Sequence, residues 1–132
     1  MMTHKHPWSD RTWIEKFRTA FRGLAIGVHG QRSFVVHLSA MVAVIAAGIV
    51  VRVDRLEWCL LALCIAGVLT AELFNSALES LARAITHEEN PHIGGALDIG
   101  SAAVLIGSLG AAVVGAAIFL RHLGPWLAAM GR

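Results

Sequence analysis

A short run of polar side chains interrupts the apolar sequence in the middle of the chain. On an α-helix, where successive residues turn by about 100°, Glu72, Asn75, Ser76, Glu79 and Arg83 fall on one face. An ionisable side chain at membrane depth costs about 2.5–3.5 kcal/mol of insertion free energy even on the most lenient scale, so two carboxylates on one face need a partner, a ligand or a wet cavity. This polar stripe is therefore the first candidate for a functional site.

The side chains of the polar stripe suit a divalent cation that is bound together with a phosphorylated ligand. Carboxylate and amide oxygens are the ligands that Mg²⁺ prefers, and one or two of them suffice where phosphates supply the rest. Asp98 begins the next apolar span, after Gly94 and Gly95, so we expect Glu72, Glu79 and Asp98 to converge at one depth. A role for Asp98 as the N-cap of the following helix is compatible with this expectation.

A purely structural interpretation of the polar stripe competes with the functional one. Glu79 and Arg83, four residues apart, would form an ion pair along the helix, and Glu72 would bond to neighbouring helices. That interpretation leaves Asn75 and Ser76 without a role. We therefore favour a functional site.

Composition indicates what kind of element must carry the stripe. Of the 132 residues, 56% are hydrophobic and 15% are charged, and the mean hydropathy is +0.65, whereas soluble domains carry about 25% charged residues. The sequence therefore predicts a membrane protein. The net charge is only +2 and the basic residues are spread thinly, which argues against a nucleic-acid partner. Cys59 and Cys64 lie in an apolar run and are interpreted as apolar fillers, not as a redox pair.

Three segments are long and apolar enough to cross a bilayer. At about 1.5 Å per residue, the uncharged residues 33–51 cover roughly the 30 Å of hydrocarbon. We predict transmembrane helices at residues 33–51, 57–83 and 98–121, and a cytoplasmic loop at residues 86–95. In the third span Gly107, Ala111 and Gly115 recur every four residues, which favours close contact with another helix.

The segment before the first span predicts a helix that lies on the membrane surface. Within residues 10–29, the apolar side chains from Trp13 to Val28 form one stripe, with Lys and Arg on the opposite face. Residues 1–9 are predicted to be a flexible tail, and we expect no signal peptide to be removed. Seven Lys and Arg residues flank the spans on the N-terminal side against four on the other side, which predicts a cytoplasmic N-terminus. The expected fold is an all-α membrane domain over residues 1–132, with an amphipathic surface helix and three transmembrane helices.

Two motifs resemble a known family. The segment from Glu72 to Glu79 is similar to the E-x-x-N-[ST]-A-x-E signature of the small prokaryotic diacylglycerol and undecaprenol kinases. The sequence Asp98-Ile-Gly-Ser101-Ala-Ala-Val-Leu resembles the start of their third transmembrane helix, at a spacing that fits without a gap. The resemblance extends through Phe34-x-x-His37 and covers most of the chain.

The resemblance implies an activity and an assembly. It implies a homotrimer in the cell inner membrane that passes the γ-phosphate of MgATP to the hydroxyl of a membrane lipid at the cytoplasmic boundary. It also implies roles for residues of this chain: general base, Glu72; support of the site, Asn75; metal and ATP binding, Glu79; contact with ATP or its metal, Glu88 and Asp98; contact with the lipid, Ser101. Phosphoryl transfer needs positioning, charge neutralisation and a base within reach of the nucleophile, so the residue types agree with these roles.

Four positions depart from the family pattern, all on the nucleotide side. Gln31 stands where the family has a second metal-binding glutamate, Leu97 where it has a lysine, Arg83 where it has an aspartate, and Asn90 where it has a histidine. Gln31 keeps an oxygen ligand without the charge. Loss of one charge-assisted phosphate contact at Leu97 costs about 1.5–3 kcal/mol. Arg83, one turn after Glu79, is a hypothetical replacement for that positive charge.

Two other functions stay open on the sequence. A family member with impaired catalysis would persist as a trimeric membrane interaction protein, as the changes at Gln31 and Leu97 allow. A small proton-coupled transporter would use Glu72 as its carrier and would leave the 86–95 loop without a role. Binding of MgATP separates the kinase from the transporter, and turnover separates it from the impaired member. The lipid also stays open between diacylglycerol and undecaprenol, although Phe34-x-x-His37 leans towards the undecaprenol branch.

Overall fold

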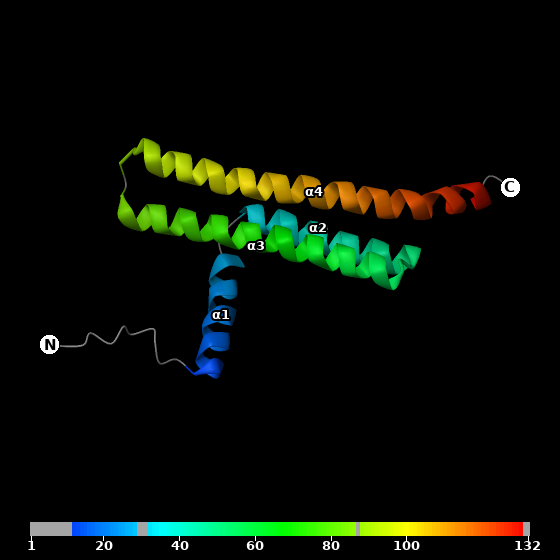
Figure 1. Cartoon of the computed structure of the whole chain (residues 1–132), viewed down its shortest axis with the longest axis horizontal. Helices are drawn as coiled ribbons and strands as arrows, with labels where there is room; N and C mark the ends of the chain where they lie inside the picture. Colours follow the sequence, from blue (N-terminus) through cyan, green and yellow to red (C-terminus); the bar gives the residue numbers. More distant parts are fainter. Residues whose placement is uncertain (1–11, 29–31, 87, 131–132) are drawn as a thin grey trace.

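The described part of the chain folds into four helices, and three of them form a bundle. The computed structural model describes residues 12–28, 32–86 and 88–130, and every regular element in these ranges is helical. The helices are α1 at Trp13–Val28, α2 at Arg32–Val51, α3 at Arg55–Ile85 and α4 at Pro91–Met130. Helices α2, α3 and α4 run side by side, and α1 lies crosswise to them near the start of α2 (Figure 1). The predicted all-α fold class is confirmed, and the predicted tail at residues 1–9 lies outside the described residues.

The three bundle helices have the length and composition of membrane spans. Ser33–Val51, Arg55–Ile85 and Pro91–Pro125 each contain a window apolar enough to cross a bilayer. Few of their side chains are buried within the chain, and large apolar residues such as Ile49, Leu63 and Ile106 are exposed on the outside of the bundle. A helix that is apolar on all sides requires lipid or other protein around it, so these outer faces suit a membrane.

A tight turn joins α2 to α3. Arg52 has a positive φ of 59°, and the Val53 amide donates to the Gly48 carbonyl. Asp54 and Glu57 then form a capping box, in which each side chain accepts a hydrogen bond from the other residue's amide, at 2.9 and 2.8 Å. These bonds satisfy amides that the first turn of a helix leaves without partners. The turn therefore fixes where α3 begins.

The connection before α4 is shorter than the predicted 86–95 loop. Helix α4 begins at Pro91, and the Asn90 side chain accepts hydrogen bonds from the amides of His92 (2.9 Å) and Ile93 (3.4 Å). Asn is a favoured N-cap, and proline at the first helical position loses no hydrogen bond, so the helix runs on through the glycines that follow. The loop prediction is wrong for residues 91–95, and so is Asp98 as N-cap, because Asp98 lies well inside α4.

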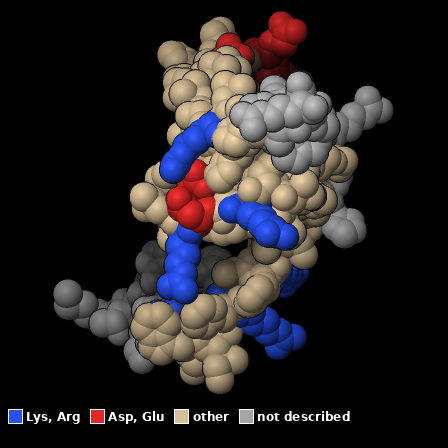
Figure 2. All heavy atoms as spheres, turned by 90° about the vertical axis from the view of Figure 1, so that its right-hand side faces the viewer, with Lys and Arg blue, Asp and Glu red and all other residues tan. Residues whose placement is uncertain are grey.

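Helices α3 and α4 are tied together at the end of the bundle remote from α1. The Glu57 side chain, 5% exposed, contacts Arg121 Nη1 at 3.3 Å and His122 Nε2 at 2.9 Å. Figure 2 views this end, where basic side chains surround a small acidic group. Next to these contacts, a buried apolar cluster is formed by Val53, Leu61 and Ile118. We call the contacts of Glu57 with Arg121 and His122 the distal clamp.

The small residues of α4 pack unevenly on α3. A Cβ atom at Gly107 would lie 4.0 Å from Val68 Cγ2, which is ordinary van der Waals contact. A Cβ atom at Gly115 would meet no atom within 4 Å. At Gly115 helices α3 and α4 leave a space between them, so this position makes no close helix contact within the described chain.

The distal clamp yields a stability prediction. Substitution Glu57→Ala removes the carboxylate that joins two helices, so we expect the thermal midpoint in detergent, followed by circular dichroism, to fall by several degrees. Glu15→Ala is the matched control, because Glu15 caps the start of α1 in the same way, through the Thr12 amide at 2.8 Å, but is exposed. An equal fall in both variants would show that only the helix cap matters and that the clamp does not.

Candidate functional site

The Glu72 carboxylate is the most deeply buried polar group among the described residues. Its exposed fraction is 0%. The Ser33 hydroxyl donates a hydrogen bond to Oε1, whereas Oε2 accepts none within the described part of the chain. His37 Nε2 lies 3.9 Å from Oε2, beyond hydrogen-bond distance. Ser33 and His37 are four residues apart on α2 and therefore share the face that α2 presents to Glu72.

Asn75 and Glu79 form the next part of the site, one and two turns further along α3. Asn75 is 7% exposed, and its Nδ2 donates to Glu79 Oε1 at 3.0 Å. The Asn75 amide oxygen is buried without a hydrogen-bond partner in the described part of the chain and faces Gly100 of α4, where a Cβ atom would lie only 2.5 Å from it. Glycine at position 100 therefore allows α4 to approach Asn75.

Arg83 lies in the last turn of α3, between the polar stripe and the connection to α4. Its Nη1 lies 3.7 Å from Glu79 Oε2, so the ion pair expected at four-residue spacing is present. Arg83, Glu88, Asn90 and Leu97 line one hollow of about 540 Å³. The structure thus brings together Glu88, for which the resemblance implies contact with ATP, and Arg83 and Asn90, two positions that depart from the family pattern.

A larger hollow lies between α1 and α3. It measures about 1230 Å³, and Ser33, Ser76, Glu79 and Arg83 are among the residues that line it. The Ser76 hydroxyl is buried and lacks a hydrogen-bond partner among the described residues. This hollow therefore offers polar groups from α2 and α3 next to α1.

The expected convergence of three carboxylates is wrong. No cluster of three or more acidic, His or Cys side chains suited to a metal ion occurs in the described ranges. Glu72 and Glu79 are seven residues apart, which separates them by about 10 Å along the helix. Asp98 is exposed. Ser101 is also exposed, and its hydroxyl donates to the Leu97 carbonyl of its own helix at 3.0 Å.

Not every residue near the site follows from the sequence. Gln31, predicted at the second metal-ligand position, lies outside the described residues. The sequence does not single out Ser33 or Gly100, and it indicates His37 only as part of the motif shared with the family. A signal for the α2 pair was present, because Ser33 and His37 are polar residues at helical spacing near the start of an apolar span. Gly100 has no such signal, since its role depends on how α4 packs on α3.

Comparison with known proteins agrees with this architecture. The profile of the family described as prokaryotic diacylglycerol kinase matches residues 18–119. The chain is 31% identical over 111 residues to the undecaprenol kinase of Bacillus subtilis strain 168, which covers 84% of this chain and 90% of that protein. It is 29% identical over 126 residues to the diacylglycerol kinase of Synechocystis sp., which covers 90% of this chain and 72% of that protein.

The chain is a helical membrane domain with a buried carboxylate face, and its relatives are named as kinases. These features together place it in the class of membrane lipid kinases. Within that class the chain belongs to the prokaryotic diacylglycerol kinase family. The resemblance drawn from the residues of the polar stripe and of α4 is confirmed.

The contact between Gly100 and Asn75 yields a prediction for activity. Gly100→Ala places a methyl group against the Asn75 amide oxygen and should displace the amide from Glu79, so we expect kcat to fall about tenfold, a loss of roughly 1.4 kcal/mol. Gly110→Ala is the control on the same helix, where a Cβ atom meets nothing within 4 Å. Lipid phosphorylation in reconstituted bilayers measures both, and equal rates for the two variants would contradict the role of this contact.

Proposed function

We propose that this protein transfers the γ-phosphate of ATP to the hydroxyl of a membrane lipid alcohol, diacylglycerol or undecaprenol. The observation that carries the proposal is the Glu72 carboxylate, which is completely buried and has one oxygen, Oε2, without a hydrogen-bond partner among the described residues. The relatives named diacylglycerol kinase and undecaprenol kinase support the two candidate lipids.

Glu72 acts as the general base in this proposal. The lipid hydroxyl gives its proton to Oε2 while its oxygen attacks the γ-phosphorus, and the bond between that phosphorus and the bridging oxygen to the β-phosphate breaks to release ADP. Ser33 holds Oε1, which leaves Oε2 as the oxygen that faces the substrate. A base positioned in this way contributes about 10²–10⁴ to the rate.

Glu79 and its neighbours hold the nucleotide. Glu79 is partly exposed and is oriented by Asn75, and one or two carboxylates suffice for Mg²⁺ when phosphates complete its coordination, so the residues present fit a metal bound with ATP. When bound, Mg²⁺ neutralises charge on the phosphates. Arg83 adds a positive charge beside Glu79, at the hollow where the lysine of the family pattern is replaced by Leu97.

Glu88, Asn90 and Asp98 complete the nucleotide side of the proposal. Glu88 and Asn90 line the same hollow as Arg83, and Asp98 lies two turns into α4 with an exposed side chain. Gln31 keeps its proposed place at the second metal position. Ser101 is proposed to contact the lipid.

The proposal places the site at the cytoplasmic boundary of the inner membrane. The excess of Lys and Arg on the N-terminal side supports a cytoplasmic N-terminus. Helix α1 supports a surface position, because Trp13, Phe17 and Phe21 are 74%, 62% and 69% exposed and would lie in the headgroup boundary. A homotrimer is proposed from the family resemblance, and the exposed apolar faces of the bundle are compatible with subunit contacts.

A test of the function uses the purified protein in bilayers that contain either diacylglycerol or undecaprenol. We expect ATP-dependent phosphorylation of at least one lipid, reduced about hundredfold or more in Glu72→Gln because the base is lost. Glu15→Gln is the control, since Glu15 is an exposed carboxylate of α1 remote from the buried stripe.

Other results of this test distinguish the alternative functions. Phosphorylation that persists in Glu72→Gln contradicts Glu72 as the base. Folded wild-type protein that binds MgATP without transfer to either lipid indicates the impaired family member, for which Leu97 and Gln31 are the positions to restore to Lys and Glu. Protein that binds no MgATP contradicts the kinase and favours the transporter.

A further inference from the structure

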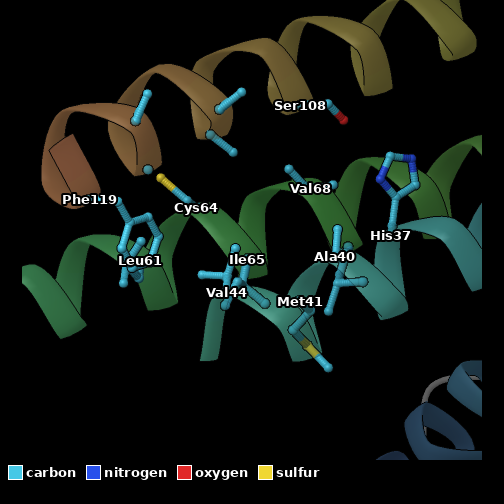
Figure 3. A pocket seen from close by; sticks show the side chains of 15 residues that line it. His37, Ala40, Met41, Val44, Leu61, Cys64, Ile65, Val68, Ser108 and Phe119 are labelled. Carbon is cyan, nitrogen blue, oxygen red and sulfur yellow. The ribbon is translucent and has the colours of Figure 1, made fainter. Parts of the chain in front are cut away.

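An apolar hollow, partly open to the outside, runs along the bundle between α2, α3 and α4. It measures about 360 Å³, and its lining is almost wholly apolar, with Met41, Val44, Leu61 and Phe119 among the residues. Figure 3 shows His37 at one end and Phe119 near the other. The hollow therefore extends from the neighbourhood of Glu72 into the membrane-spanning part of the bundle.

The dimensions of the hollow limit what it can hold. Along α4 it is lined from Ser108 to Phe119, a separation of eleven residues or about 16 Å. Apolar cavities of about 150 Å³ already admit benzene. A volume of about 360 Å³ over this length suits one hydrocarbon chain.

Small side chains of α4 create this space. Ala111, Ala112, Gly115 and Ala116 all line the hollow, and no atom lies within 4 Å of a Cβ atom built at Gly115. Larger side chains at these positions would fill the gap between α4 and the two facing helices. The depth to which the hollow is open is thus set by residues of α4.

The polar end of the hollow adjoins the catalytic carboxylate. His37 lines the hollow, and its Nε2 lies 3.9 Å from Glu72 Oε2. A lipid alcohol whose hydroxyl reaches Oε2 has its first carbons beside His37. The hollow is then a continuous apolar path for the rest of the chain.

We propose that the hollow binds a single hydrocarbon chain of the lipid substrate, with the hydroxyl at Glu72, and that Gly115 sets how deeply this chain extends. The inference rests on the proposed function, because it takes Glu72 as the base that meets the lipid. Acyl glycerols and prenols both carry a hydrocarbon chain of the kind that the hollow would bind. A one-chain site leaves the second chain of a diacylglycerol in the surrounding lipid.

The test compares two leucine substitutions on one helix. Gly115→Leu fills the hollow without a clash at Cβ, and Gly110→Leu is matched to it, since its Cβ also meets open space and Gly110 does not line the hollow. The substrates are geraniol and geranylgeraniol in one arm, and dihexanoylglycerol and dioleoylglycerol in the other. The short chains end before Gly115, and the long chains pass it.

We expect Gly115→Leu to lower kcat/KM for the long-chain alcohols about tenfold or more, in the range of steric discrimination by apolar pockets. The rate with short chains should stay as in wild type, and Gly110→Leu should match wild type throughout. If Gly115→Leu discriminates by chain length among the prenols, the substrate is a prenol. If it does so among the acyl glycerols, the substrate is a diacylglycerol. Wild-type rates for Gly115→Leu on long chains overturn the proposal, and so does an equal loss on all substrates with a change in oligomeric state by native mass spectrometry.

A binding measurement separates failure of the hollow from failure of the kinase. Geranylgeraniol with a diazirine at its far end should label wild-type α4 between Ser108 and Phe119, and Gly115→Leu should lose this labelling. Labelling there without phosphorylation of any lipid contradicts the kinase but retains the chain site. Phosphorylation with labelling only elsewhere overturns the chain site and retains the kinase.

Discussion

The Glu72 carboxylate, removed completely from solvent inside a membrane helix, is the constraint on which the rest of the structure depends. Burial of a carboxylate is tolerated only where hydrogen bonds or ligands compensate for lost hydration. Ser33 satisfies one oxygen, and the other has no hydrogen-bond partner in the described ranges. An unsatisfied buried polar group costs about 1–3 kcal/mol, so a substrate hydroxyl at this oxygen would relieve an existing cost.

The packing of α4 on α3 divides the bundle into three zones. Near the polar stripe, Gly100 brings α4 against Asn75. At the remote end, the distal clamp fixes α4 through Glu57. Between these contacts the helices separate around Gly115 and leave the apolar hollow. In the proposed function, two fixed ends with a space between them would let a lipid chain enter while the reacting groups keep their positions.

Helical periodicity was sufficient to predict the contents of the site on α3. It placed Glu72, Asn75 and Ser76 on one face, and all three are buried. It could not predict that Ser33 meets Glu72, because that contact depends on the register between two helices. The prediction that Glu72, Glu79 and Asp98 converge was wrong, because the rise along α3 separates Glu72 from Glu79. The start of α4 was misjudged although Asn90 and Pro91 carry a helix-start signal.

The central claim is that the buried Glu72 carboxylate, oriented by Ser33, is the catalytic base. Its most direct test compares the kcat of Ser33→Ala with the kcat of Ser39→Ala. Both serines lie on α2, but the Ser39 hydroxyl donates to the Val35 carbonyl of its own helix, at 2.8 Å. If Ser33 orients the base, its loss should lower kcat about tenfold or more, as expected for a hydrogen bond to a charged group, with the KM for ATP unchanged. Equal kcat values for the two variants would contradict the account.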